Sequence, residues 1–226
     1  MITVGRYISR MMSQCNPQNS PVVFVIDDDI SIRESLESLL RCEGFEVEAF
    51  ESAQEFLDRP RSLVPSCLIL DISLPGLNGL ELQRRVAIER QDMPIIFITG
   101  HGSIPMSVQA MKAGAIEFLT KPFSDSVLLT AIRNAIERSK ILLNRDEVLR
   151  ELKSRYSLLT SREREVCVLV VAGLPNKQVG SELGISEITV KAHRGSMMRK
   201  MQASSLAELV NMATRLRLTR NQHSAV

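Results

Sequence analysis

Five short apolar runs in the first 120 residues constrain the fold of this chain more than any other feature. Each run is five or six residues long, is rich in β-branched or aromatic residues, and is separated from the next by a longer amphipathic stretch. The runs are VVFVI (22–26), FEVEAF (45–50), CLILD (67–71), PIIFIT (94–99) and AIEFLT (115–120). Strands that alternate with helices are typical of a parallel sheet buried on both faces. We therefore expect an α/β fold with a doubly wound, five-stranded parallel sheet.

Capping signals mark where the helices between these runs begin. In a capping box, a Ser, Thr or Asn side chain accepts a hydrogen bond from an amide three residues later, and a Glu there bonds back. Pairs of this kind are Ser31 with Glu34, Ser52 with Glu55, and Asn78 with Glu81. A further helix begins near Ser124, and neither Gly nor Pro interrupts residues 124–156. We expect its first half to pack on the sheet and residues 139–156 to form a linker helix with a weak dimer seam.

The sequence after Tyr156 contains helix signals only. Capping boxes pair Thr160 with Glu163 and Ser205 with Glu208, Gly173-Leu174-Pro175 separates two helices, and Gly184 separates two more. A Gly184 turn followed by a helix capped by Ser186 is helix-turn-helix spacing. The predicted division is a tail at 1–20, an α/β domain at 21–138, a linker helix at 139–156, a helical domain at 157–219 and a tail at 220–226.

Charge and composition narrow the classes of function. Residues 1–144 carry 14 Lys and Arg against 18 Asp and Glu, whereas residues 145–226 carry 14 against 8. The basic second part suits a polyanion such as DNA, although an excess of six charges also fits an ordinary solvated surface. Four distant cysteines without CxxC spacing favour reduced thiols over zinc or disulfides. The N-terminal stretch has no apolar core of a secretory signal, and no run approaches the ~18 apolar residues of a membrane span. We expect a cytoplasmic protein without a membrane partner.

Polar residues collect where four of the five predicted strands end. The first strand is followed by Asp27-Asp28-Asp29, the third ends in Asp71, the fourth ends in Thr99, and the fifth is followed by Lys121. Each residue alone is a common cap, turn or solvated residue, but ligands in open α/β sheets bind at the carboxyl ends of the strands. Crowded carboxylates recruit a cation, and oxygen ligands suit Mg²⁺. A carboxylate can also attack phosphorus to form an aspartyl phosphate, whose oxygens a lysine and a hydroxyl stabilise.

The runs VFVIDDD, LILDISLPGLNGLEL, IIFITGHG and MKAGAIEFLTKPF resemble the receiver domain of two-component response regulators, over about residues 21–138. The resemblance implies that Asp71 accepts the phosphoryl group, that Thr99 binds its oxygens and that Lys121 pairs with them. It also implies that Mg²⁺ is held by Asp27, Asp28, Asp71 and the backbone carbonyl of Ser73, with Asp27 acting largely through water. Phe118 lies where the family places an aromatic switch residue, more often Tyr than Phe; its alternative role is strand packing.

The second helix of the predicted helix-turn-helix separates a core face from a basic face. Ser186, Val190, His193, Met197 and Met201 share the face assigned to the core, and Ile188, Lys191, Ala192, Gly195 and Arg199 lie opposite. In a major groove, lysine can donate to guanine and an alanine methyl can contact thymine. His193 has no second ligand at usable spacing, so packing is favoured over metal binding. Helix-turn-helix pairs also occur in proteins that bind no DNA.

The segment LTSREREVCVLVVAGLPNKQVGSELGISEITVKAHRGSMMRKM resembles the LuxR-type DNA-binding domain, which would cover about residues 157–218. With the receiver in front, the chain resembles the NarL/FixJ class of response regulators, and its GHGSIPMSVQAMKAGAIEF run is close to the FixJ branch. The resemblance implies base contacts from Lys191, Ala192 and Gly195, and backbone contacts from Lys177, Thr189, Arg194 and Arg199. Gly195 departs from relatives that have a longer side chain at this position.

We therefore expect a transcription regulator, not an enzyme, that is controlled by phosphorylation. Its expected partners are a sensor histidine kinase, double-stranded promoter DNA, a second copy of the chain after phosphorylation, and RNA polymerase. One alternative is a phosphatase with Asp71 as nucleophile, but haloacid-dehalogenase hydrolases have a second Asp two residues later, where this chain has Ser73. The other alternative is a constitutive DNA binder whose receiver serves only for dimerisation.

Overall fold

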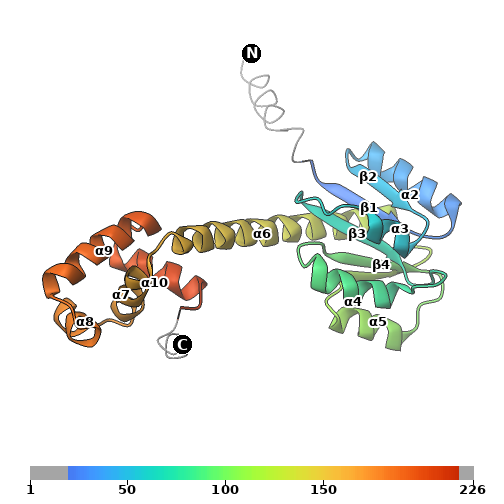
Figure 1. The fold of residues 1–226 in the computed structure, drawn as a ribbon. Helices are drawn as coiled ribbons and strands as arrows, with labels where there is room; N and C mark the ends of the chain where they lie inside the picture. The colour runs from blue at the N-terminus through green and yellow to red at the C-terminus, as the bar shows by residue number, and fades with distance from the viewer. Residues whose placement is uncertain (1–19, 219–226) are drawn as a thin grey trace, which may run out of the picture. The chain divides into compact units, whose positions relative to one another are not determined.

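The computed structural model describes residues 20–218 and contains a five-stranded, all-parallel sheet with the strand order β2-β1-β3-β4-β5 (Figure 1). The chain separates into two compact units, residues 1–144 and residues 145–226. The sheet lies in the first unit, and the described elements of the second unit are all helices. The predicted fold class is therefore confirmed. Across residues 20–218, we find no helix with the length and apolar character that crossing a membrane requires.

The secondary structure follows the alternation seen in the sequence. The strands are β1 (Val22–Ile26), β2 (Glu46–Phe50), β3 (Ser66–Asp71), β4 (Ile95–Thr99) and β5 (Glu117–Thr120). The first unit contains the helices α2 (Ile30–Cys42), α3 (Ala53–Asp58), α4 (Gly79–Glu89) and α5 (Ile104–Lys112), and α6 (Asp125–Ser157) begins there. The second unit contains α7 (Ser161–Val171), α8 (Asn176–Leu183), α9 (Glu187–Met201) and α10 (Leu206–Arg215). All five predicted strands are present within two residues of their expected bounds.

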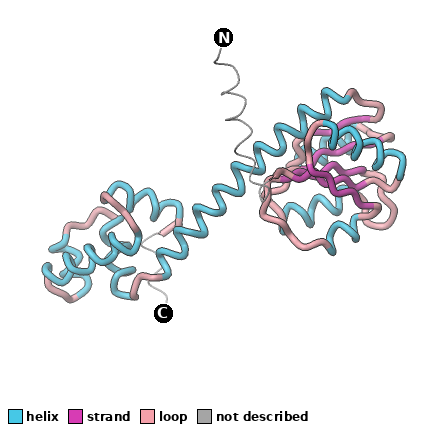
Figure 2. Tube along the Cα trace, turned by 90° about the horizontal axis from the view of Figure 1, so that it is seen from above, coloured by secondary structure: helices cyan, strands magenta, loops and turns pink. Residues whose placement is uncertain are grey.

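Helices cover both faces of the sheet, as Figure 2 shows. Side chains alternate along each strand, so each face has its own core. In β1, Phe24 and Ile26 pack with residues of α3, α4 and α5, whereas Val23 and Val25 pack with residues of α2 and α6. Burial of each such side chain contributes about 1.5–3 kcal/mol to folding. Because both faces are covered, polar side chains are accommodated mainly at the ends of the strands.

Most helices begin where their capping signals predict. Ser52 and Asn78 cap α3 and α4 through their side chains. The prediction that Ser31 caps the first helix is wrong, because the cap of α2 is Asp29, whose carboxylate accepts a hydrogen bond from the Ser31 amide at 2.8 Å. A carboxylate also interacts favourably with the positive end of the helix dipole, so the earlier residue takes the capping position.

One continuous helix, α6, spans 33 residues. In the first unit, Leu128 packs against the sheet, and Ser139 is the last residue of α6 in this unit that is buried. The Ser139 hydroxyl donates to the carbonyl oxygen of Asp92 at 2.6 Å, which fastens α6 to the loop before β4. In the second unit, Leu152 of the same helix belongs to the helical core. The proposed linker at 139–156 and the other domain limits stay predictions.

The second unit contains the expected helix-turn-helix. The helix α8 ends at Gly184, which has a φ of +65°, and α9 follows with Ser186 as its cap. The carbonyl oxygen of Gly180 accepts hydrogen bonds from the amides of both Gly184 and Ile185. A Cβ atom on Gly180 would lie 2.7 Å from the carbonyl oxygen of Ile185. The turn therefore leaves no space for a side chain at position 180.

Candidate functional site

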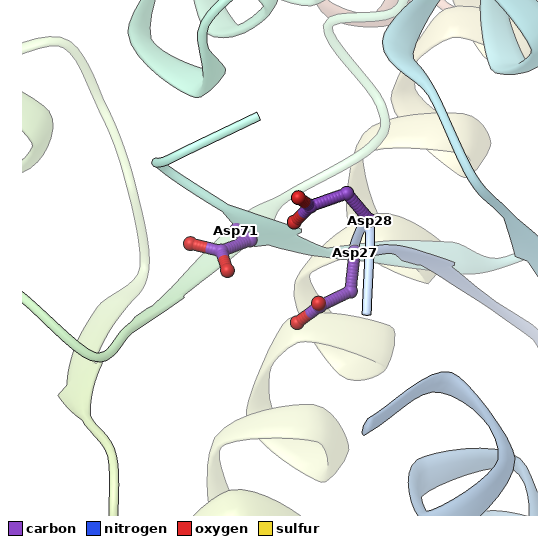
Figure 3. Close-up of side chains that lie close together, drawn as sticks. All are labelled: Asp27, Asp28 and Asp71. Atoms are coloured by element: carbon purple, nitrogen blue, oxygen red, sulfur yellow. The ribbon is translucent and has the colours of Figure 1, made fainter. Parts of the chain in front are cut away.

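The carboxyl ends of β1 and β3 bring three aspartates together (Figure 3). Asp71 is the last residue of β3, and Asp27 and Asp28 directly follow β1. One carboxylate oxygen from each aspartate lies within 4.8 Å of the others. Asp27 and Asp71 are buried, whereas Asp28 is exposed. Because β1 and β3 are neighbours at the point where the strand order reverses, this cluster lies where open α/β sheets bind ligands.

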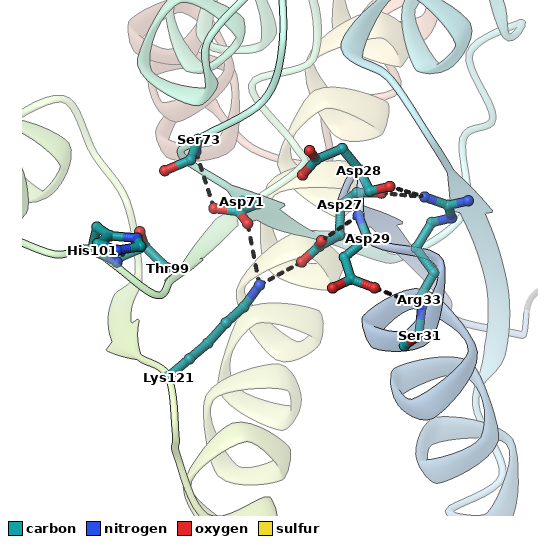
Figure 4. A network of polar contacts seen from close by, with 10 residues as sticks. All are labelled: Asp27, Asp28, Asp29, Ser31, Arg33, Asp71, Ser73, Thr99, His101 and Lys121. Atoms are coloured by element: carbon teal, nitrogen blue, oxygen red, sulfur yellow. Dashed lines mark hydrogen bonds and ion pairs between the residues drawn. The ribbon is translucent and has the colours of Figure 1, made fainter.

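The ammonium group of Lys121 bridges two of these carboxylates. Its Nζ atom lies 2.6 Å from Oδ2 of Asp27 and 3.2 Å from Oδ2 of Asp71 (Figure 4). Burial raises the pKa of Asp27, and the hydrogen bond from Lys121 opposes that rise. Burial alone would lower the pKa of Lys121, but the hydrogen bond to Asp27 and the charges of both aspartates outweigh burial and raise it. Lys121 is therefore held as a cation beside the carboxylates.

Two backbone features hold Asp71 in position. The amide of Ser73 donates to Oδ1 of Asp71 at 3.0 Å, while Oδ2 faces Lys121. Gly79 begins α4 close to the end of β3, and a Cβ atom at this position would lie 2.6 Å from the carbonyl oxygen of Asp71. Glycine is therefore required here for the close approach of the α4 start to the strand. Sequence reasoning missed Gly79 because this contact exists only in the folded chain.

The turn after β1 is held by an arginine that the sequence does not single out. Arg33 Nη1 donates to the carbonyl oxygens of Asp27, at 2.7 Å, and Asp28, at 3.0 Å. The amide of Asp29 donates to Oδ1 of Asp27 at 3.0 Å, and Asp29 in turn caps α2. Figure 4 shows how these bonds join the acidic turn to the first turns of the helix. In the sequence, nothing distinguishes Arg33 from an ordinary solvated arginine on a helix.

Thr99 and Phe118 lie near the loop that follows β4. Thr99 is fully buried at the end of β4, and its hydroxyl oxygen accepts a hydrogen bond from the amide of His101 at 3.2 Å. Phe118 is half-buried in β5, with its ring centroid 6.4 Å from that of Phe97. A Cβ atom on Gly102 would lie 3.1 Å from the Phe118 ring and 3.2 Å from Cγ2 of Thr99. The loop is thus in close contact with both side chains.

This donor set fits a hard divalent cation and a phosphoryl group. Within residues 20–218, the three aspartates form the one close group of acidic, His or Cys side chains with metal-binding potential. Carboxylate oxygens are the ligands that Mg²⁺ prefers, and the exposed Asp28 leaves the cluster open to solvent. A buried carboxylate flanked by a lysine cation also has the groups needed to accept a phosphoryl group and to stabilise its charge.

The helix α9 presents a second candidate surface. Five of the seven residues expected to contact DNA are exposed, namely Lys177, Lys191, Ala192, Gly195 and Arg199. On the core face of α9, Val190, Met197 and Met201 are buried and His193 is half-buried, as predicted. The assignment of Ser186 to the core face is wrong, because this residue is exposed in its role as helix cap. The described geometry therefore leaves exposed a face of α9 that carries both small and basic residues.

The other two residues expected to contact DNA make hydrogen bonds within the second unit. Arg194 is half-buried, and its Nη1 donates to Oδ1 of Asn176 at 2.6 Å, which ties α9 to the start of α8. The hydroxyl of Thr189 lies 2.8 Å from that of Ser186 in the first turn of α9. A contact from Arg194 to a phosphate would compete with its bond to Asn176.

Comparison with known proteins finds one family model in each of the two units. The family model described as response regulator receiver domain matches residues 23–133, and that described as bacterial regulatory proteins, luxR family, matches residues 157–213. Nodulation protein W of Bradyrhizobium diazoefficiens is 50% identical over 200 residues, covering 88% of each chain. Transcriptional regulatory protein FixJ of the same species is 42% identical over 193 residues, covering 85% of this chain and 94% of FixJ.

Solved structures of similar sequence extend over most of the chain. The structure of the response regulator StyR has a TM-score of 0.77 at 47% identity, covering 87% of this chain and 99% of StyR. Full-length FixJ from B. japonicum has a TM-score of 0.53 at 41% identity, covering 87% of this chain and 97% of FixJ. The likeness therefore includes residues of both units.

Proposed function

Because this chain is a response regulator of the NarL/FixJ class, with a receiver domain and a LuxR-type DNA-binding domain, we propose that phosphorylation of Asp71 controls its binding to promoter DNA. Proteins of this family regulate transcription in two-component systems, where the receiver implies a histidine kinase partner and the LuxR-type domain implies DNA. The observation that carries the proposal is the Lys121 ammonium group, 2.6 Å from Asp27 and 3.2 Å from Asp71. A cation held beside the nucleophile stabilises the charge of an incoming phosphoryl group.

In the proposed reaction, a carboxylate oxygen of Asp71 attacks the phosphorus of a phosphohistidine on the kinase. A P–O bond forms, the P–N bond breaks, and the leaving imidazole takes the electron pair and a proton. Thr99 would bind the oxygens of the transferred group, and Lys121 would pair with them. Asp27, Asp28, Asp71 and the carbonyl oxygen of Ser73 would hold Mg²⁺, which when bound neutralises negative charge on the phosphoryl oxygens.

The proposed output is a changed surface around α5. Thr99 would exchange its hydrogen bond from the His101 amide for one with the phosphoryl group, and Phe118 would move toward the space released. The exposed residues Ile104, Val108 and Met111 lie at i, i+4 and i+7 and form an apolar stripe on α5. A second copy of the chain covering this stripe would give a dimer after phosphorylation, because an exposed apolar patch favours association.

The dimer would present two copies of α9 to DNA. In each, Lys191, Ala192 and Gly195 would face base edges in the major groove, and Lys177, Thr189, Arg194 and Arg199 would lie near phosphates. The excess of basic over acidic residues in 145–226, 14 against 8, supports this assignment because phosphate contacts dominate the affinity of DNA-binding proteins. RNA polymerase would be the further partner of the promoter-bound dimer, in the cytoplasm.

We propose that the chain does not itself act as an enzyme. A phosphatase of the haloacid-dehalogenase type needs a general acid two residues after its nucleophile. Here that residue is Ser73, whose amide bonds to Asp71 and whose hydroxyl is no acid at neutral pH. The aspartyl phosphate would therefore persist as a signal.

The proposal is tested by phosphorylation of the full chain with acetyl phosphate, followed by intact-mass measurement. Wild type should gain one phosphoryl group in Mg²⁺, and Asp71→Asn should gain none, because an amide lacks the nucleophilic charge. Asp58→Asn, which changes an exposed carboxylate of α3, is the matched control and should react as wild type does. Full modification of Asp71→Asn, or of wild type in chelator, would contradict the proposed site.

The coupling of the two domains needs a second measurement. Sedimentation and DNA-binding titrations before and after phosphorylation should show a shift toward the dimer and tighter binding. If both stay unchanged while Asp71 is fully modified, the receiver is a passive module and the chain is a constitutive DNA binder.

A further inference from the structure

The helix α9 carries one isoleucine, Ile188, whose side chain is exposed and contributes little to the packing of the helices. Ile188 is the second residue of α9 and is 79% exposed, whereas Val190, two residues later, is completely buried. A β-branched residue is a weaker helix former than Ala, and its exposed surface gains nothing from burial. The stability of the second unit therefore does not explain an isoleucine at this position.

Ile188 belongs to a stripe of apolar and small residues along α9. Ala192 and Gly195 follow it at i+4 and i+7, and all three are exposed. On one side of the stripe, Nζ of Lys191 lies 3.1 Å from Oε1 of Glu187, so these two charges compensate one another in the first turn. The outward surface at the start of α9 is thus apolar at its centre, with the exposed Arg199 near the other end of the helix.

In helix-turn-helix proteins, the N-terminal residues of the second helix contact base edges in the major groove. Among the four bases, thymine alone presents a methyl group there, and apolar side chains recognise it by contact. We propose that Ile188 is a specificity-determining residue that packs against a thymine methyl in each half-site. This inference rests on the proposed DNA binding and adds to it a preferred base. The branched side chain suits the role, because it is nearly fixed at χ1 on a helix and loses little freedom on contact.

The test uses the full chain, phosphorylated with acetyl phosphate, and a duplex selected by this protein from a random library. Each thymidine of one half-site is replaced in turn by deoxyuridine, which removes only the methyl group. With wild type, one replacement should weaken binding about fourfold through the loss of the Ile188 contact, since one buried methyl or methylene is worth that factor in Kd. Ile188→Ala should be insensitive to the same replacement, and Ile188→Val should retain part of the effect.

Leu158→Ala provides the matched control, because Leu158 is 63% exposed in the second unit but lies outside α9. This variant should keep the wild-type response to every replacement. If Ile188→Ala responds to deoxyuridine as wild type does at all positions, another residue reads the methyl groups and the inference is wrong. A library that yields no enriched sequence would instead overturn the proposed DNA binding itself, and the inference with it.

Discussion

The same substitution at two glycines of the helix-turn-helix should have opposite effects on stability. Gly180 lies in α8 and Gly195 in α9, and both are replaced by Ala. In an exposed helix interior, Ala is favoured over Gly by about 0.5–1 kcal/mol. A Cβ atom on Gly195 would have no heavy atom within 4 Å, so Gly195→Ala should stabilise the second unit by that amount.

At Gly180 the new methyl group would meet the backbone. Its distance from the carbonyl oxygen of Ile185 would be 2.7 Å, and neither group is the end of a flexible side chain. Relief of the overlap requires movement of the turn, in which the amides of Gly184 and Ile185 both donate to the Gly180 carbonyl. Overpacking of this kind costs about 1–3 kcal/mol, and loss of one hydrogen bond adds about 1 kcal/mol. After the gain in helix propensity, we expect a net destabilisation of about 1–3 kcal/mol.

Hydrogen exchange of the full chain, followed by mass spectrometry of peptides, measures these changes locally. Peptides from α8 and α9 should exchange faster in Gly180→Ala and more slowly in Gly195→Ala, because exchange follows the free energy of opening. Peptides from β1 and β3 serve as the internal control and should be unchanged. Equal effects of the two substitutions, of either sign, would refute the steric argument.

Other substitutions test the receiver site, the proposed DNA-contacting face of α9 and the helical core. Arg33→Ala should slow modification by acetyl phosphate about three- to tenfold in a mass-spectrometric time course, because the acidic turn loses two hydrogen bonds. In DNA-binding titrations, Lys191→Ala should reduce the binding free energy at a selected sequence by about 1–3 kcal/mol and should remove the preference for one base at one position. Lys177→Ala should instead reduce the affinity for all sequences alike, and the slope of log K against log salt concentration should become shallower by about one. Burial alone would raise the pKa of Glu163, but hydrogen bonds, first that from Lys200, lower it to about 2. The charge of Glu163 therefore stabilises the fold above about pH 4.5, and this contribution is lost as the pH falls through about 2. In urea titrations at pH 7, the free energy of unfolding of Glu163→Gln should be about 1–3 kcal/mol lower than that of wild type. The difference between the two proteins should shrink below pH 4.5.

The sheet and the acidic cluster could be predicted because their signals are local. Strands buried on both faces are continuous apolar runs, so their bounds are visible in the sequence to within two residues. Once the strands are known to be parallel, the residues that end them must lie at one edge of the sheet. This reasoning places Asp71, Thr99 and Lys121 at one edge of the sheet without knowledge of any contact between them.

The supporting residues could not be predicted, because their roles depend on contacts that the fold creates. Gly79 is required by the carbonyl oxygen of Asp71, and Gly180 by that of Ile185, and neither distance follows from a pattern. Whether Asp29 or Ser31 caps α2 likewise depends on a backbone conformation that exists only in the folded chain. Both side chains can cap a helix, and the turn after β1 decides which of them does.

The order of the strands explains how one side chain, that of Lys121, can contact both Asp27 and Asp71. In the order β2-β1-β3-β4-β5, Asp71 ends the central strand, Asp27 follows its neighbour on one side, and Lys121 follows the strand two places away on the other. The Lys121 side chain therefore reaches from the end of β5 to the end of β1, past the ends of the two strands that carry Asp71 and Thr99. Phosphorylation of Asp71 would increase the negative charge at the centre of this span, and the ammonium group would be drawn from Asp27 toward the phosphoryl oxygens. Since the Thr99 hydroxyl is engaged with the loop before α5, its attraction to the same oxygens would transmit the change to the surface of the domain.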